Sequence, residues 1–174
     1  MKKLICLVLL AMMLICVFAG CSYEPVLVKK GGSTNTTESE KETVFGVGDT
    51  VELNDVEVTL VGIHQSEGSA YNKPETGNVF VLCEFNIVNN SDEELNVSTM
   101  LNFDAYCDDY SCSLSIGALL EKEDKEQLDG TVAAGKKMNG VVGYEVPADW
   151  TEFEIRYTPD AFGGKEIVFI ATND

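Results

Sequence analysis

Apolar and polar residues alternate with a period of two along most of the chain beyond residue 44. This alternation predicts β-strands that each turn one face toward a core. The segments with this pattern are 56–61, 79–87, 141–146, 153–157 and 167–170. The last of them is apolar on both faces, as a central strand is. About seven to nine short strands at this spacing predict an all-β fold, an antiparallel β-sandwich.

Turn-forming residues separate the predicted strands. Asn89–Asp92 are expected to end a long strand, because their side chains can bond the local backbone. Pro147 is expected to end the next one, since it has no N–H for the ladder. Only residues 119–127 suggest a helix, of about one or two turns, because Glu121 and Lys125 are spaced as an i,i+4 pair.

The N-terminus has the order of a bacterial lipoprotein signal. Lys2 and Lys3 precede an apolar stretch, Leu4–Phe18, which small residues separate from Cys21. A spanning helix needs about 20 apolar residues, so the stretch is marginal for a retained anchor and suits a signal helix that is removed. We expect residues 1–20 to be a signal peptide and Cys21 to carry the lipid, in preference to a retained anchor or an ordinary secretory signal.

The composition changes between the signal and the strands. Residues 22–43 are rich in Ser, Thr, Gly, Lys and Glu and carry almost no aromatic side chains. Such a segment buries too little apolar surface to order itself, which predicts a disordered tether over residues 21–43. The remaining residues, 44–174, have the size of one domain.

The chain is strongly acidic, with 29 Asp and Glu against 12 Lys and Arg and a formal charge of −17. Such a field repels phosphate backbones and anionic headgroups. It therefore argues against nucleic-acid binding and against peripheral membrane adhesion, whereas a cationic partner remains compatible. Acidity also keeps a surface protein soluble, which is the simpler explanation.

Candidate catalytic and metal-binding residues are few. His64, the one histidine, follows a predicted strand and is expected to be a solvated loop residue rather than a general base. The acids cluster in two places, 104–109 and 121–126, but neither has the alternate spacing with glycine of a calcium loop. We therefore expect no catalytic residue, no metal site and no cofactor.

Three cysteines fall within the predicted domain. Cys83 alternates with apolar neighbours and is expected to be a small buried side chain. Cys107 and Cys112 flank four residues, 108–111, which we interpret as a hairpin loop that brings the two cysteines opposite one another. They are a candidate disulfide.

Several short motifs, weak one at a time, follow one another in a specific order. They are Gly48–Val51, Val56–Leu60, Gly77–Val81, Ile87–Glu93, Ala133–Lys137, Gly140–Pro147 and Ile155–Pro159. Together they resemble the telokin-like domain of unknown function in lipoproteins of Gram-positive bacteria, which is similar to a secreted immunoprotective antigen. The resemblance implies an immunoglobulin-like sandwich and an extracytoplasmic location. It implies no activity.

The sequence therefore favours a lipoprotein on the outer face of the cell membrane, held there by the lipid on Cys21, with a non-catalytic binding domain for a protein or cell-envelope partner. The alternative is an accessory subunit of an envelope transporter or cell-wall enzyme complex. A deep pocket lined by aromatic residues would favour a small ligand, and a flat exposed apolar patch would favour a protein.

Overall fold

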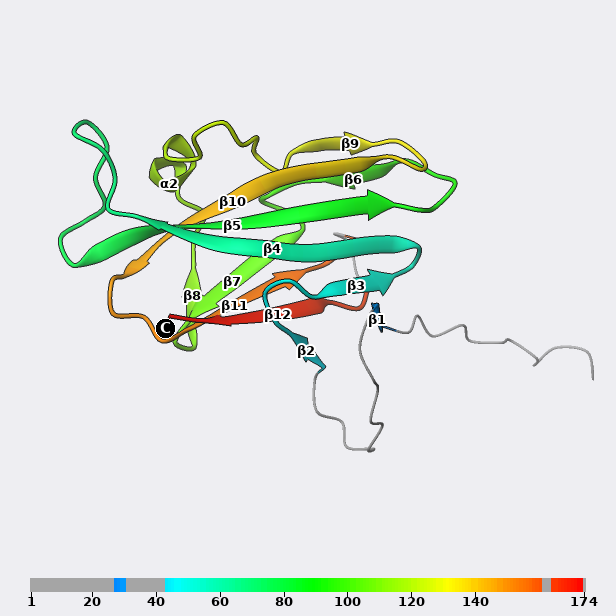
Figure 1. Ribbon diagram of the computed structural model, residues 1–174, viewed down its shortest axis with the longest axis horizontal. Coiled ribbons are helices and arrows are strands. Elements are labelled where there is room, and N and C mark those ends of the chain that lie inside the picture. Colours follow the sequence, from blue (N-terminus) through cyan, green and yellow to red (C-terminus); the bar gives the residue numbers. More distant parts are fainter. Residues whose placement is uncertain (1–26, 31–42, 161–163, 174) are drawn as a thin grey trace, which may run out of the picture.

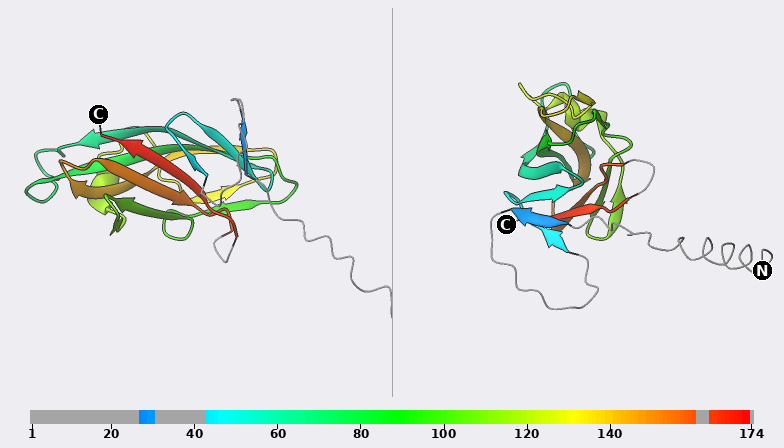
Figure 2. Two further views of the ribbon diagram at one scale, coloured as in Figure 1. Left: turned by 90° about the horizontal axis from the view of Figure 1, so that it is seen from below. Right: turned by 90° about the vertical axis from the view of Figure 1, so that its right-hand side faces the viewer.

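The computed structural model describes residues 27–30, 43–160 and 164–173, and they form two stacked β-sheets (Figure 1). Sheet A has the strand order β1-β3-β4-β5-β10, and sheet B has the order β2-β12-β11-β7-β8. Strands β6 and β9 pair separately. Two further views show the same two layers (Figure 2). The predicted all-β sandwich is confirmed.

The strands are β1 (Val28–Lys30), β2 (Val44–Phe45), β3 (Thr50–Leu53), β4 (Val56–Ser66), β5 (Asn78–Asn89), β6 (Leu95–Val97), β7 (Phe103–Cys107), β8 (Tyr110–Cys112), β9 (Gly130–Val132), β10 (Lys137–Pro147), β11 (Glu152–Tyr157) and β12 (Ile167–Thr172). They outnumber the seven to nine expected, because strands of two to four residues are too short to show a period. Pairing is antiparallel except between β2 and β12, which are parallel. The helix α2 (Ile116–Leu120) lies on the outer side of sheet A.

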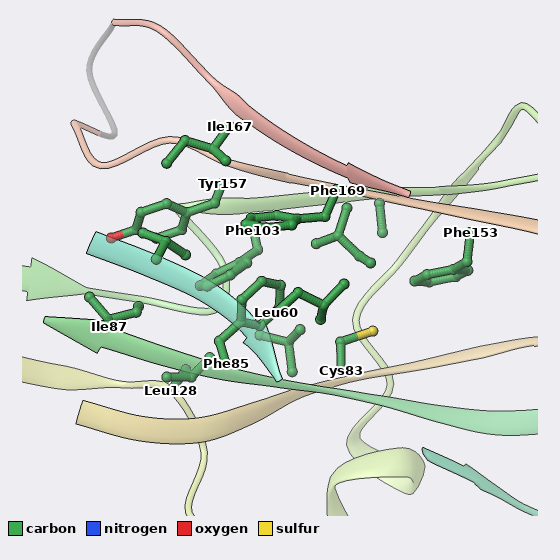
Figure 3. Close-up of a cluster of buried hydrophobic side chains, with 14 of the residues drawn as sticks. Leu60, Cys83, Phe85, Ile87, Phe103, Leu128, Phe153, Tyr157, Ile167 and Phe169 are labelled. Atoms are coloured by element: carbon green, nitrogen blue, oxygen red, sulfur yellow. The ribbon is translucent and has the colours of Figure 1, made fainter. Parts of the chain in front are cut away.

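The core fills the space between the two sheets (Figure 3). Phe85 of sheet A lies 5.2 Å from the ring of Phe103 and 5.7 Å from that of Phe169, both in sheet B. These aromatic contacts join the layers, and burying a side chain of this size contributes about 2–3 kcal/mol. Cys83 is fully buried in the same core, which confirms its expected role.

The expected strand ends are confirmed at two positions. β5 ends at Asn89, whose side chain accepts a hydrogen bond from the backbone N–H of Ser91 at 3.1 Å and donates to the carbonyl of Glu93 at 2.7 Å. It also donates to the carbonyl of Val132, at 2.9 Å, which no local pattern predicts. β10 ends at Pro147.

The helix lies earlier in the chain than expected, and the prediction of a helix over 119–127 is wrong. α2 begins after Ser115, whose side chain accepts from the N–H of Ala118, and it ends at Leu120. Ala118 packs on β10 where Gly143 has no side chain, since a Cβ there would come within 2.9 Å of the Cβ of Ala118. Tertiary contacts therefore set the helix position.

Part of the predicted tether belongs to sheet A. β1 is an edge strand of this sheet and pairs with β3, with Val28 opposite Glu52 and Lys30 opposite Thr50. Leu27 packs against the core. The other tether residues, the signal peptide and Cys21 lie outside the described residues. Among the residues that the structure describes, no helix is long and apolar enough to cross a membrane.

Candidate functional site

Two neighbouring features on the outer side of sheet A form the candidate site. The first is a polar cleft lined by His64 and Lys125, the two residues that bond the buried Glu84, and the second is an apolar surface on α2. Both arise because residues 113–129, which connect β8 to β9, cross the outer side of this sheet. Chain segments far apart in sequence therefore meet there.

Glu84 lies in the middle of β5 with its side chain on the outer face. Alternation alone predicts a solvated carboxylate, but only 8% of the residue is exposed, because the segment after α2 covers it. The carboxylate accepts hydrogen bonds from Lys125 at 2.6 Å and from Asn139 at 3.2 Å, and it lies 3.3 Å from Nε2 of His64. The bond from Lys125 holds the pKa of Glu84 below its ordinary value, against the opposing effect of burial. The expectation that water surrounds this acid is wrong.

His64 lies in β4 and not in a loop, so that prediction is also wrong. β4 continues to Ser66, and His64 pairs with Leu82. A bulge between Leu60 and Gly62 shifts the register, which changes the face to which later side chains point. The bulge places His64 on the outer face, where its side chain is 53% exposed.

The His64–Glu84 pair supplies an orienting acid, which the sequence did not predict. A hydrolytic site would also need a nucleophile in contact with the imidazole. Within the described part of the chain, the hydrogen bonds of His64 lead only to Glu84, and Ser66 accepts instead from the N–H of Gly68 at 3.0 Å. The arrangement is an ion-pair cluster that holds a connecting segment against the sheet.

An open cleft of about 440 Å³ lies between the ends of β4 and β5 and residues 120–125. His64, Ser66 and Lys122 line it with polar groups, and Leu82 contributes apolar surface. It has no aromatic lining, so it lacks the stacking surfaces that hold most small organic ligands.

Exposed apolar side chains lie beside this cleft. Ile116 and Leu120, one helical turn apart on α2, are 78% and 70% exposed. Tyr71, in the loop between β4 and β5, is fully exposed. The side chain of Asn72 donates to the carbonyl of Gly117 at 2.8 Å, which fixes that loop against α2 at the same end of the sandwich (Figure 1). We call Tyr71, Ile116 and Leu120 the α2 patch.

The surroundings of the α2 patch are mainly acidic. Five acids and two lysines lie in segments 67–75 and 116–124. They are Glu67, Glu75, Glu121, Glu123 and Asp124, with Lys73 and Lys122. An apolar centre with a charged rim is the usual composition of a protein-binding surface.

The acids of the two sequence clusters, 104–109 and 121–126, include residues that form structural hydrogen bonds. The carboxylate of Asp108 accepts from the backbone N–H groups of Thr151 and Glu152, at 3.1 and 2.9 Å, and thereby fixes the β7–β8 hairpin. Glu121 accepts from Asn72 at 2.6 Å. In the described ranges, no group of three or more His, Cys, Asp or Glu side chains could hold a metal ion.

The predicted hairpin at Cys107 and Cys112 is present, but its loop has two residues and not four. Cys107 pairs with Tyr110, and Cys112 pairs with Ala105. The two cysteines are therefore diagonal neighbours, and the expectation that they lie opposite one another is wrong. Both are thiols in this structure.

Residues 45–167 match a protein family described as a domain of unknown function, DUF4352. The sandwich thus belongs to a class of domains known by fold and sequence and not by activity. The chain is a member of the DUF4352 family. No curated protein matches it.

Two solved structures from Bacillus subtilis are similar in fold. The candidate lipoprotein ycdA is 22% identical, with a TM-score of 0.57 over 68% of this chain and 37% of its own. This chain thus matches little more than a third of that protein. The protein yjhA is 17% identical, with a TM-score of 0.55 over 71% of this chain and 96% of its own. At these identities the likeness shows the fold alone.

Proposed function

We propose that this protein is a lipoprotein anchored to the outer face of the cell membrane through Cys21, and that its sandwich binds a protein partner through the α2 patch. The observation that carries the binding role is the exposure of Ile116 and Leu120 on one face of a helix whose opposite face is buried. Burying those side chains against a partner releases water, which is the main driving force of association.

The acidic residues around the α2 patch restrict which partners can bind there. A segment with apolar side chains flanked by Lys or Arg complements both the α2 patch and its surroundings, whereas an anionic membrane or a nucleic acid is repelled. A protein fits better than a small ligand, because the neighbouring cleft is open and has no aromatic lining.

We also propose that the domain is related to the telokin-like, immunoglobulin-like domains and is similar to a secreted immunoprotective antigen. The proposal also includes the absence of catalysis, since His64 has Glu84 beside it but no nucleophile among its described hydrogen-bond partners. A turnover of ester, peptide or cell-wall polymer that His64→Ala abolishes would contradict this part. A partner that is a transporter or cell-wall enzyme would make the protein an accessory subunit of that complex.

Lipid attachment is tested with Cys21→Ala in cells that make the protein. We expect the variant to leave the membrane fraction or to accumulate as the precursor, and to lose incorporation of labelled fatty acid. Cys83→Ala, with a buried thiol, is the matched control and should stay in the membrane. Unchanged lipid labelling of Cys21→Ala would refute the anchor.

The α2 patch is tested by placing a photo-reactive phenylalanine derivative at Ile116 and, as the control, at Met100. Met100 is 79% exposed but lies between β6 and β7. We expect one partner to crosslink at position 116 and not at 100, and the crosslink to weaken with Leu120→Ser. About 1 M salt, which shortens the Debye length to about 3 Å, should weaken it further. Equal crosslinking at both positions, or none, would refute the site.

A further inference from the structure

The β7–β8 hairpin places two thiols on the same side of sheet B. Cys107 and Ala105 are alternate residues of β7, so they share the inner face, and Cys112 lies opposite Ala105. Each of the two cysteines affects the pKa of the other, and the Sγ of Cys112 donates a hydrogen bond to the carbonyl of Tyr110 at 3.5 Å. The two side chains are therefore diagonal neighbours on one face although their residues are not directly paired.

The hairpin holds the two side chains in this diagonal arrangement. Asp108 and Asp109 have φ values of 46° and 69°, the left-handed backbone of a two-residue hairpin turn. The carboxylate of Asp108 ties the turn to the backbone N–H groups of Thr151 and Glu152 at the start of β11. Cys107, directly before the turn, is thereby fixed, while Cys112 lies on β8, the edge strand of sheet B.

Both thiols also line an open cleft. The cleft has a volume of about 390 Å³, and Tyr110 and Pro147 form part of its wall. Cys112 is half-buried and Cys107 is 4% exposed, so a small reagent reaches Cys112 first. Cys83 is fully buried and does not line this cleft.

We propose that Cys107 and Cys112 are a reversible dithiol–disulfide pair that a small-molecule disulfide oxidises outside the reducing cytoplasm. The Cys112 thiolate attacks one sulfur of the small disulfide, forming a mixed disulfide and releasing one thiolate. The Cys107 thiolate then attacks the Sγ of Cys112, which forms the Cys107–Cys112 bond and releases the second thiolate. The small disulfide accepts two electrons, and the two protein protons end on the released thiols.

The register of β7 and β8 explains why the Cys107–Cys112 disulfide is reversible. Diagonal residues of a ladder are about 7–8 Å apart at Cα, which is at or beyond the usual reach of a disulfide. Closing the bond must therefore draw β8 toward Cys107, and an edge strand has one neighbour fewer to prevent this. A bond formed with such a shift is more easily reduced than an unstrained one.

The thiols are also slow to react at neutral pH. Burial, with smaller contributions from Cys112, Asp108 and Asp149, raises the pKa of Cys107 to about 11. Burial likewise raises the pKa of Cys112. Because only the thiolate attacks, the oxidation rate should rise by about tenfold for each pH unit below these pKa values.

The test treats the full-length protein in detergent with oxidised glutathione and then blocks the remaining thiols with an alkylating reagent in denaturant. Cleavage after glutamate at Glu84, Glu94 and Glu121 separates Cys83 from the other two cysteines. We expect fragment 95–121 to be unlabelled and two hydrogen masses lighter than its reduced form. A second cleavage before Asp108 should leave its halves joined until a reductant is added.

The controls separate this pair from other thiol chemistry. Cys83→Ala should keep the link, and Cys112→Ala should lose it and leave Cys107 to be alkylated. Alkylation of both cysteines in the treated wild type, a glutathione adduct that stays on Cys112, or a link to Cys83 would each overturn the proposal. The proposal depends on the proposed location only for its cellular oxidant. The glutathione experiment does not depend on location, so its failure is distinct from failure of the lipid-anchor test.

Discussion

Asn89 provides the sharpest test of how this sandwich is held together, because its buried side chain joins three segments of backbone. Its amide donates to the carbonyls of Glu93 and Val132, and its oxygen accepts from the N–H and the hydroxyl of Ser91. The bond to Val132 connects the end of β5 to β9, 43 residues later in the chain. Replacing Asn89 with Ala removes all of these bonds.

The expected loss follows from the groups left without a partner. The carbonyl of Val132 is buried, and leaving such a group unsatisfied costs about 1–3 kcal/mol. The carbonyl of Glu93 is more exposed and can bond water. We therefore expect Asn89→Ala to lower the free energy of unfolding by about 2–3 kcal/mol. Asn89→Asp should lose at least as much, since it keeps the acceptor for Ser91 but directs a carboxylate oxygen at two carbonyls.

Urea unfolding followed by tryptophan fluorescence measures the effect. With a slope of about 1–3 kcal/mol/M, the midpoint should fall by about 1 M while the slope stays unchanged. Asn90→Ala is the matched control, because Asn90 bonds Glu57 in an exposed contact, and its effect should stay within about 0.5 kcal/mol. An Asn89→Asp variant as stable as the wild type would refute the reasoning.

Three further predictions follow from the site and its supports. Glu84 has a pKa below its ordinary value of 4.5, so its contribution to stability is present above that pH and is lost as the pH falls through the lowered value. Acid unfolding curves should therefore show a smaller loss of stability below pH 4.5 for Glu84→Gln than for the wild type, and equal pH dependence would contradict this. Gly143→Ala should push Ala118, and α2 with it, away from β10 and lower the free energy of unfolding by about 1–3 kcal/mol. Gly46→Ala, whose added Cβ would have no neighbour closer than 3.9 Å, should lower it less, and equal unfolding midpoints for the two variants would count against the close contact. Brief trypsin treatment should cut at Lys41, within the predicted tether, and leave the predicted domain, residues 44–174, uncut; a first cut between β4 and β12, seen by mass spectrometry, would show that the boundary is wrong.

Local patterns predicted the inner faces of the long strands. In β5, Val81, Cys83 and Phe85 are buried, as their alternation indicated, and the strand ends at Asn89 as its turn chemistry indicated. These features depend on a few consecutive residues. A strand with one face in the core must place apolar side chains at every second position, so its pattern is visible without knowledge of its neighbours.

The outer face of sheet A could not be predicted in this way. Glu84 has the position of a solvated acid, and it is buried only because the segment around Lys125, 41 residues later, crosses above it. The apparent i,i+4 pair of Glu121 and Lys125 indicated a helix, but each side chain bonds a distant residue instead. The energy of a local ion pair is a few tenths of a kcal/mol, which tertiary contacts easily exceed.

The class of fold, the long strands and the apolar face of each could be predicted from the amino-acid sequence, because these follow from which residues avoid water within one segment. The position of α2, the face of His64 and the diagonal arrangement of Cys107 and Cys112 depend instead on how distant segments pack. One extra residue in β4 reverses the side to which His64 points, and a two-residue turn makes the two cysteines diagonal neighbours. Such one-residue differences leave the hydrophobic pattern almost unchanged, yet they determine which side chains meet, because alternate residues of a strand face opposite sides.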